Sequence, residues 1–103
     1  MKRYRVIWDD KAKSELRDIY EYLKNDANVL QAAVRVRKEL TKMTASLQTM
    51  PMRYKVYEYA DKEIGDYRSV VRWHYRIIYA ILDKEVHIVR IVHTSSAPDS
   101  IKL

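Results

Sequence analysis

The stretch Tyr75-Arg76-Ile77-Ile78-Tyr79-Ala80-Ile81-Leu82 decides the fold, because it is almost continuously apolar and rich in β-branched and aromatic residues. Such residues favour extended backbone, and a strand that is apolar on both faces suits the middle of a sheet. We therefore predict a central strand at Arg76–Leu82, whose second face is either covered by the end of the chain or left for a partner. Two neighbouring strands are expected at about Tyr67–Trp73 and Val86–His93. The connecting turns are expected at Trp73-His74-Tyr75 and Asp83-Lys84-Glu85.

Two amphipathic helices are predicted upstream, because apolar residues recur there at spacings of three and four. The first helix ends near Asn25, and its apolar stripe consists of Ala12, Leu16, Ile19, Tyr20 and Leu23. The second ends at Met50-Pro51, and its stripe consists of Ala33, Val36, Leu40, Met43 and Leu47. We expect Asp9 or Asp10 to cap the first helix, and Asn28 with Gln31 to form a capping box for the second.

The remaining segments complete the predicted order of elements. Residues 3–8 are expected to form a short first strand, and Arg53–Glu58 forms either a strand or an extended loop. The short Asp26-Ala27 connection implies that the two helices form an antiparallel hairpin. We therefore predict an α+β fold, β-α-α-β-β-β(-β), with an antiparallel sheet packed on an N-terminal helical hairpin. Residues 1–103 are expected to form one domain.

The composition limits the kinds of site that the chain can carry. Lys and Arg outnumber Asp and Glu by 20 to 14, and the resulting charge of +6 favours an anionic partner such as nucleic acid or an acidic protein surface. The absence of Cys and the single Gly exclude a thiolate zinc site and a glycine-rich phosphate loop. Neither a metal nor a cofactor is expected. No apolar run approaches the roughly 20 residues of a membrane span or forms a signal-peptide core, so we expect a cytoplasmic location.

The candidate functional residues gather in the second half of the chain. They are four arginines with neighbouring aromatic and histidine side chains: Arg68, Arg72, Arg76, Arg90, Tyr67, Tyr75 and His93. Residues of equal parity share a face of a strand, so Arg68, Arg72 and Arg76 would line one side if the turn between them preserves the register. Arginine binds phosphate oxygens and tyrosine stacks on bases, which suits RNA or phosphate. The alternative is a solvated sheet face whose arginines pair with acidic residues.

Histidine is the side chain best suited to proton transfer near neutral pH. Of the three histidines, His74 is expected in a turn and His87 on a strand between apolar residues. His93 ends the last strand and is the one suited to take a proton from a ribose hydroxyl. The Asp9-Asp10 pair is explained more simply as a helix cap than as a metal site.

With these features together, the chain resembles the RelE/ParE superfamily of toxins, also known as plasmid stabilisation toxins. The resemblance rests on the opening Tyr4-Arg5-Val6-Ile7-Trp8, the strand Tyr75-Arg76-Ile77-Ile78-Tyr79, and the terminal strand that ends at His93. It spans roughly residues 3–98. The resemblance implies a growth-arresting toxin that is neutralised by an acidic, partly disordered antitoxin protein.

The superfamily has two branches, and the resemblance implies a different target for each. RelE-like members cleave mRNA in the ribosome, whereas ParE-like members inhibit DNA gyrase. For the RelE-like branch the implied catalytic residues are Arg68, Arg76 and His93. We expect Arg72, Arg90, Tyr67 and Tyr75 to bind nucleic acid or another target. The chain departs from that branch at Val70, where a second basic residue is expected, and in the tail Thr94–Pro98, which has neither Arg nor Tyr. We therefore favour the ParE-like interpretation, with ribosome-dependent RNA cleavage and a non-toxic RNA-binding module as the alternatives.

Overall fold

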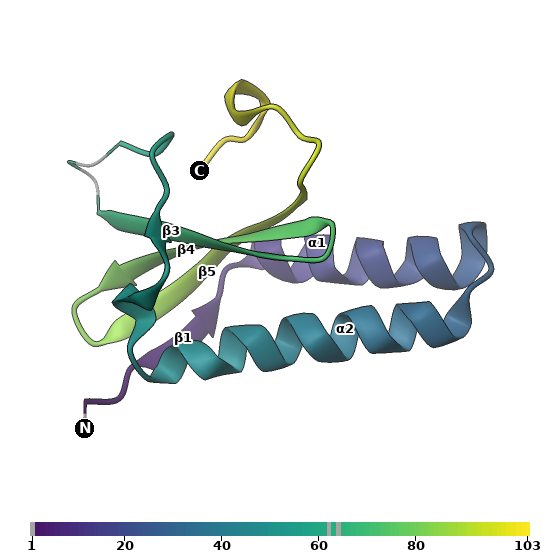
Figure 1. Cartoon of the computed structure of the whole chain (residues 1–103), viewed down its shortest axis with the longest axis horizontal. Helices are drawn as coiled ribbons and strands as arrows, with labels where there is room; N and C mark the ends of the chain where they lie inside the picture. The colour runs from purple at the N-terminus through teal and green to yellow at the C-terminus, as the bar shows by residue number, and fades with distance from the viewer. Residues whose placement is uncertain (1, 62, 64) are drawn as a thin grey trace.

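A computed structural model of the chain describes residues 2–61, 63 and 65–103. Two helices and five strands form its framework: β1 (Arg5–Trp8), α1 (Asp10–Glu21), α2 (Leu30–Ala45), β2 (Lys55–Val56), β3 (Asp66–Arg72), β4 (Tyr75–Leu82) and β5 (Glu85–His93). Short helical turns connect or follow them: η1 (Tyr22–Asp26), η2 (Ser46–Gln48), η3 (Pro51–Arg53) and η4 (Pro98–Ser100). The predicted strands and helices are thus present (Figure 1). Lys55–Val56 forms a strand, which is one of the two alternatives predicted for Arg53–Glu58.

The strands form one sheet in the order β1-β5-β4-β3-β2, which places β4 in the centre as predicted. The pairs β2–β3, β3–β4 and β4–β5 are antiparallel, whereas β1 lies parallel to β5. The α+β fold class is confirmed, and the parallel edge strand makes the sheet mixed. A short turn can join only antiparallel neighbours, but β1 is separated from β5 by the helical hairpin and three strands, so its direction is not fixed by a turn.

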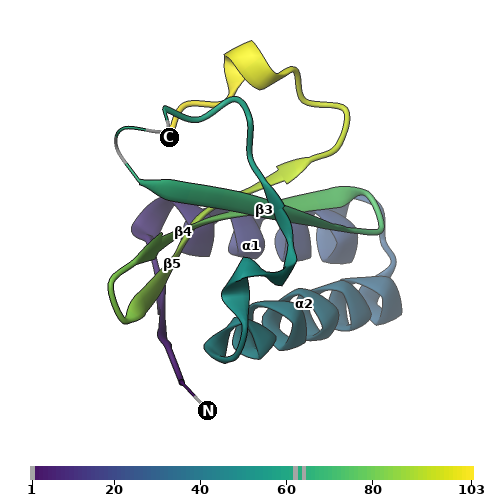
Figure 2. The same ribbon diagram turned by 60° about the vertical axis from the view of Figure 1, so that its left-hand side comes forward.

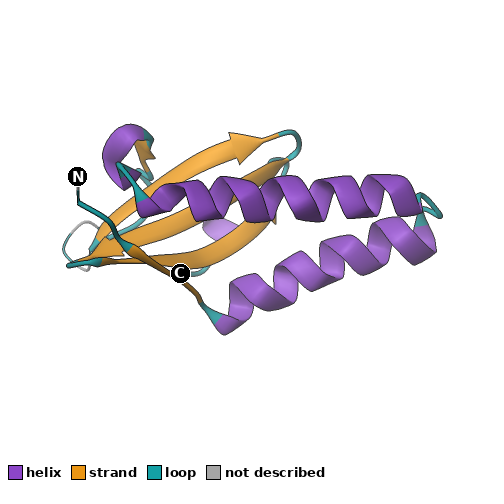
Figure 3. Cartoon of the chain, turned by 90° about the horizontal axis from the view of Figure 1, so that it is seen from below, coloured by secondary structure: helices purple, strands orange, loops and turns teal. Residues whose placement is uncertain are grey.

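The helical hairpin covers one face of the sheet, as Figure 3 shows from the helix side. Both predicted stripes face the core there. Ala12, Leu40 and Leu47 are fully buried against Ile77 and Tyr79 of β4. In the described part of the chain, no helix has the length and apolar content that crossing a membrane requires.

A smaller apolar cluster lies on the opposite face of the sheet, which we call the outer face. It consists of Tyr57, Ile78 and Val92, with Ala60, Tyr67 and Ile101 packed against it. Figure 2 shows the segment after β2 and the C-terminal end of the chain on this side of the sheet. The second face of the central strand is therefore partly covered by the end of the chain, which is one of the two alternatives predicted from the sequence.

The predicted helix caps are wrong in their side chains. Asp9 is the N-cap residue of α1 but makes no side-chain cap bond, and its Oδ1 lies 3.4 Å from Nδ1 of His87. Val29, not Asn28, precedes α2, so no capping box forms. Asn28 has a φ of 54° and lets the chain reverse, after which the Val29 N–H donates to the Leu23 carbonyl at 2.7 Å. Asn28 therefore adopts the left-handed backbone of the turn and does not occupy the N-cap position of α2.

The two turns that join the long strands are close to those predicted. Trp73 has a φ of 55° and Asp83 a φ of 56°, so non-glycine residues adopt the left-handed backbone that tight hairpins need. Arg72 pairs with Tyr75, and Leu82 with Glu85, so each turn contains two residues. This length fixes which side chains share a face, and it decides the geometry of the candidate site.

Candidate functional site

The predicted alignment of Arg68, Arg72 and Arg76 on one face is wrong. Cross-strand partners share a face, and Arg68 is paired with Tyr79, whose side chain is in the helix-side core. Arg72 follows Arg68 on that face. Arg76 instead shares a face with Ile78, which belongs to the cluster on the outer face. The two-residue turn therefore puts Arg76 on the side of the sheet opposite the other two arginines.

Arg68 is held inside the fold. Its Nη1 donates to the carbonyl oxygens of Met52 and Tyr54, each at 2.9 Å, and its Nε donates to Oδ1 of Asp66 at 3.1 Å. Its side chain is only 19% exposed. Arg68 thus fastens the segment before β2 to β3, and its hydrogen-bonding nitrogens already face protein acceptors.

Arg72 lies at the helix-side end of β3, near the turn. Its Nη2 is 3.5 Å from a carboxylate oxygen of Glu39 on α2, and its guanidinium carbon lies 5.1 Å from the ring centre of Trp73. Its Nε is buried and has no hydrogen-bond partner within the described residues. Arg72 is therefore tied to α2 by one long ion pair.

Arg90 is bound both by α1 and by the C-terminal end of the chain. Its Nε and Nη2 donate to the two carboxylate oxygens of Glu15 on α1, at 3.0 and 2.8 Å. Its Nη1 donates to the backbone carbonyl of Lys102 at 2.8 Å. The hydrogen bonds that Arg90 donates to Glu15 are the main reason that the pKa of Arg90 is raised.

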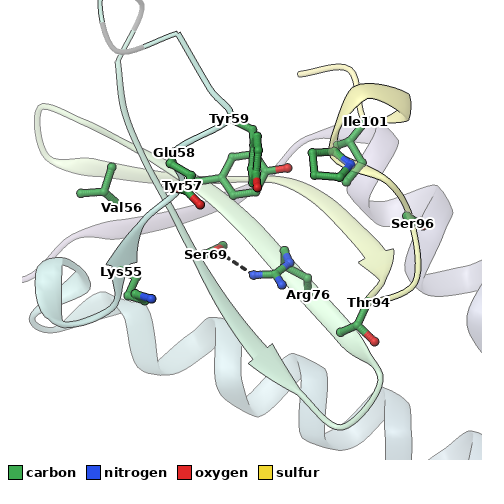
Figure 4. A pocket seen from close by; sticks show the side chains of 11 residues that line it. Lys55, Val56, Tyr57, Glu58, Tyr59, Ser69, Arg76, Thr94, Ser96 and Ile101 are labelled. Carbon is green, nitrogen blue, oxygen red and sulfur yellow. Dashed lines mark hydrogen bonds between the residues drawn. The ribbon is translucent and has the colours of Figure 1, made fainter.

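Arg76 lines a cavity of about 360 Å³ on the outer face, shown in Figure 4. The cavity is formed by the β2 segment, the sheet and the C-terminal end of the chain, through Lys55, Val56, Tyr57, Glu58, Tyr59, Ser69, Arg76, Thr94, Ser96, Pro98 and Ile101. Nη1 of Arg76 donates to Oγ of Ser69 at 3.3 Å. No carboxylate lies within ion-pairing distance of this guanidinium in the part of the chain that the structure describes. A half-buried cation facing a polar cavity is suited to an anion.

The pKa of Tyr57 reflects the burial and the charges around this outer-face cavity. Burial raises the pKa of its hydroxyl, while the positive charges of Arg76 and Arg90 act in the opposite direction. Its ring makes an edge contact with Tyr59, the centroids being 5.7 Å apart. Sequence reasoning missed Lys55 and Tyr57 as cavity residues. Lys55 and Tyr57 are two positions apart, so in a strand next to β3 they share a face, and this pattern could have identified them.

His93 lies on the helix side of the sheet, opposite Tyr75. Its ring stacks on His74 with centroids 5.9 Å apart and makes an edge contact with Tyr75 at 6.0 Å. Its Nδ1 accepts the Ser95 N–H at 3.1 Å, which leaves Nε2 as the nitrogen that can carry a proton. Burial raises the pKa of Tyr75, and Tyr67 packs half-buried on the outer face.

The three residues suggested for RNA cleavage are therefore not brought together. Arg76 lies on the outer face, while Arg68 and His93 lie on the helix side. Those two are paired with residues four positions apart on β4, Tyr79 and Tyr75, a separation of roughly 13 Å along a strand. Across the described residues, no group of three or more His, Cys, Asp or Glu side chains could hold a metal ion.

Comparison with known proteins identifies the family. The family model described as "ParE toxin of type II toxin-antitoxin system, parDE" matches residues 6–98. A chain of the chromosomal ParDE toxin–antitoxin system of P. aeruginosa is similar in structure, with a TM-score of 0.69 and 20% identity over 88% of this chain and 96% of that chain. A chain of the RelBE2 toxin–antitoxin complex of Mycobacterium tuberculosis is similar with a TM-score of 0.54 and 24% identity over 93% and 97% of the two chains.

At these identities the two structures show a shared fold. No curated protein matches the sequence. The family model carries the assignment, because it matches the chain from β1 to the first residue of η4 and includes both helices. The resemblance to the RelE/ParE superfamily is thereby confirmed, and the chain belongs to the ParE family of toxins of type II toxin–antitoxin systems.

Proposed function

We propose that this toxin arrests bacterial growth by binding and inhibiting DNA gyrase in the cytoplasm, with residues 1–103 acting as one domain. The membership in the ParE family supports this proposal. The observation that carries it is the separation of Arg76 from Arg68 and His93 by the sheet. Inhibition by binding needs a complementary surface, whereas catalysis needs several groups around one reacting atom.

The chemistry of metal-independent RNA cleavage explains why this separation supports the proposal. A base must reach the ribose hydroxyl within hydrogen-bonding distance, and cations must face the same phosphate to stabilise its developing charge. The outer-face cavity supplies Arg76 and Lys55 but contains no histidine among its described lining residues. His93 is instead positioned beside α1, in a second cavity with Asp18 and Tyr22. These residues do not form one nuclease site.

A supercoiling assay with purified gyrase tests the proposal. Wild-type toxin is expected to inhibit supercoiling at micromolar concentration, and addition of its antitoxin should restore activity. Arg76→Ala is expected to weaken inhibition, because it removes the guanidinium that has no carboxylate partner in the described chain. A matched variant, Arg5→Ala, removes an exposed arginine on the edge strand β1 and should inhibit like wild type. Absence of inhibition by folded wild-type toxin would refute the proposal.

Ribosome-dependent mRNA cleavage is the second candidate, and one observation favours it. Arg76, Lys55, Tyr57 and Tyr59 line the same cavity, so cations and aromatic rings for an RNA strand do meet on the outer face. Primer extension on mRNA in translating ribosomes is the test. Cuts at the A site that disappear in Arg76→Ala would replace the gyrase proposal with this one. Normal growth during overexpression, with neither activity, would instead favour a non-toxic RNA-binding module.

We also propose an acidic, partly disordered antitoxin as the partner. The net charge of +6 supports this proposal, as does the Arg76 guanidinium, which has no carboxylate partner among the described residues. A binding assay with the protein encoded by the adjacent reading frame should show affinity that falls as salt concentration rises. Affinity that is independent of salt would contradict a charge-based partner.

A further inference from the structure

We infer that Arg90 is a positioning residue. Pinned by Glu15 on α1, it holds the C-terminal tail (residues 94–103) across the outer face and thereby forms one wall of the cavity that contains Arg76. This inference concerns the shape of the cavity, so it stands whether the cavity meets gyrase, the ribosome or the antitoxin.

The edge of β5 explains why Glu15 is placed where it is. β1 pairs with β5 from Glu85 to Ile88, and in the described chain no strand covers β5 beyond that point. The Ile91 N–H on this free edge donates to Oε1 of Glu15 at 2.9 Å. The same carboxylate accepts two hydrogen bonds from Arg90. The Glu15 carboxylate on α1 therefore accepts a hydrogen bond from the free edge of β5 and also fixes the Arg90 guanidinium at that edge.

This ion pair is the most buried one among the described residues. The side chains of Arg90 and Glu15 are 14% and 16% exposed, whereas every other described pair has a member at least 25% exposed. The pair is bidentate, which fixes the orientation of the planar guanidinium as well as its position. Once two nitrogens are fixed in this way, the third points in one direction only.

That third nitrogen, Nη1, donates to the Lys102 carbonyl and so reaches the tail. Ile101, the preceding residue, packs against the outer-face cluster of Tyr57, Ile78 and Val92. Thr94, Ser96, Pro98 and Ile101 of the tail line the Arg76 cavity. A continuous set of contacts therefore runs from α1 through Arg90 and the tail to the cavity wall. Figure 4 shows Thr94, Ser96 and Ile101 of the tail around the cavity that contains Arg76.

Amide hydrogen exchange measured by NMR tests the inference. The N–H groups of Ser100 and Ile101 donate to Ala97 and Pro98 carbonyls, so their exchange reports on the closed tail. In Arg90→Ala we expect both amides to exchange about tenfold faster or more, the change expected when a charge-assisted hydrogen bond to the tail is removed. Ile101→Ala should accelerate the Ser100 amide similarly without touching the ion pair. Arg5→Ala breaks another arginine–glutamate pair and should change the tail less than twofold.

The controls separate this role from general unfolding and from the proposed function. Exchange at the central strand β4 reports on any loss of overall stability, so the tail amides must open at a free energy below that of β4. Arg90→Lys should rescue only part of the protection, because an ammonium cannot bind Glu15 bidentately and reach Lys102. Unchanged tail exchange in folded Arg90→Ala would overturn the inference. Since the readout is local exchange and not growth arrest, its outcome does not depend on whether gyrase is the target.

Discussion

Replacing Tyr79 with Phe removes one hydroxyl from the centre of the molecule. Tyr79 ends the Tyr75–Tyr79 stretch and is fully buried, and its hydroxyl donates to the Pro51 carbonyl at 2.5 Å. Pro51 is itself buried, so the acceptor loses its partner where water has little access. Leaving a buried acceptor unsatisfied costs about 1–3 kcal/mol. The free energy of unfolding should fall by about that amount, with a drop in Tm of roughly 4–8 °C for each kcal/mol in a domain of this size.

Urea unfolding followed by circular dichroism measures this loss, because the midpoint shifts while the slope stays constant if the two end states are unchanged. Tyr59→Phe is the matched control. Tyr59 is 61% exposed, so removing its hydroxyl should change the free energy by less than about 0.5 kcal/mol. Equal effects of the two substitutions, or a loss below about 0.5 kcal/mol in Tyr79→Phe, would refute the argument that the Tyr79–Pro51 bond fastens η3 beneath the sheet.

Three further predictions follow from the same contacts. Stability should fall above pH 10, and it should fall less in Tyr79→Phe. Burial raises the folded-state pKa of Tyr79, so the unfolded chain loses this proton first, and the stabilisation present below pH 10 is lost as the pH rises through the folded pKa. Urea unfolding midpoints measured from pH 8 to 11 check the sign. Glu15→Ala should lower the free energy of unfolding by about 3–5 kcal/mol, because it leaves Arg90 buried and unpaired, whereas Arg5→Ala, at an exposed pair, should shift the melting curve much less. Arg76→Ala should leave stability within about 0.5 kcal/mol in thermal melts, since its one described hydrogen bond is long, and a larger loss would make Arg76 a structural residue.

The sequence predicts the elements of this fold well because each has a local cause. The apolar run of β4 and the alternating strands beside it place the sheet within a residue or two, and helical spacing places α1 and α2. The direction of β1 has no local cause. Whether it lies parallel or antiparallel to β5 depends on the path of the chain through the helical hairpin, and the residues of β1 do not determine that path.

The candidate site was harder to predict because it depends on the length of one turn. A three-residue turn at Trp73-His74-Tyr75 would pair Arg72 with Arg76 and put both on one face. The observed turn has two residues, so Arg72 pairs with Tyr75, and Arg76 moves to the other face. A change of one residue in register reverses the face of every side chain that follows. Trp73 adopts a left-handed backbone there, which its residue type does not predict.

The four candidate arginines, Arg68, Arg72, Arg76 and Arg90, differ in their surroundings because they differ in which acidic groups can reach them. Glu39 and Glu15 project from the helices to Arg72 and Arg90, and Asp66 lies two residues from Arg68 on the same strand face. Arg90 also lies on the outer face, but beside the open edge of β5, where Glu15 of α1 reaches it. Arg76 lies on the central strand β4, and among the described residues its guanidinium donates a hydrogen bond only to the Ser69 hydroxyl. Much of the desolvation of its guanidinium has already occurred on folding, so an incoming carboxylate or phosphate gains the attraction with less of the opposing cost. Of the four, Arg76 is therefore the arginine at which a partner gains most.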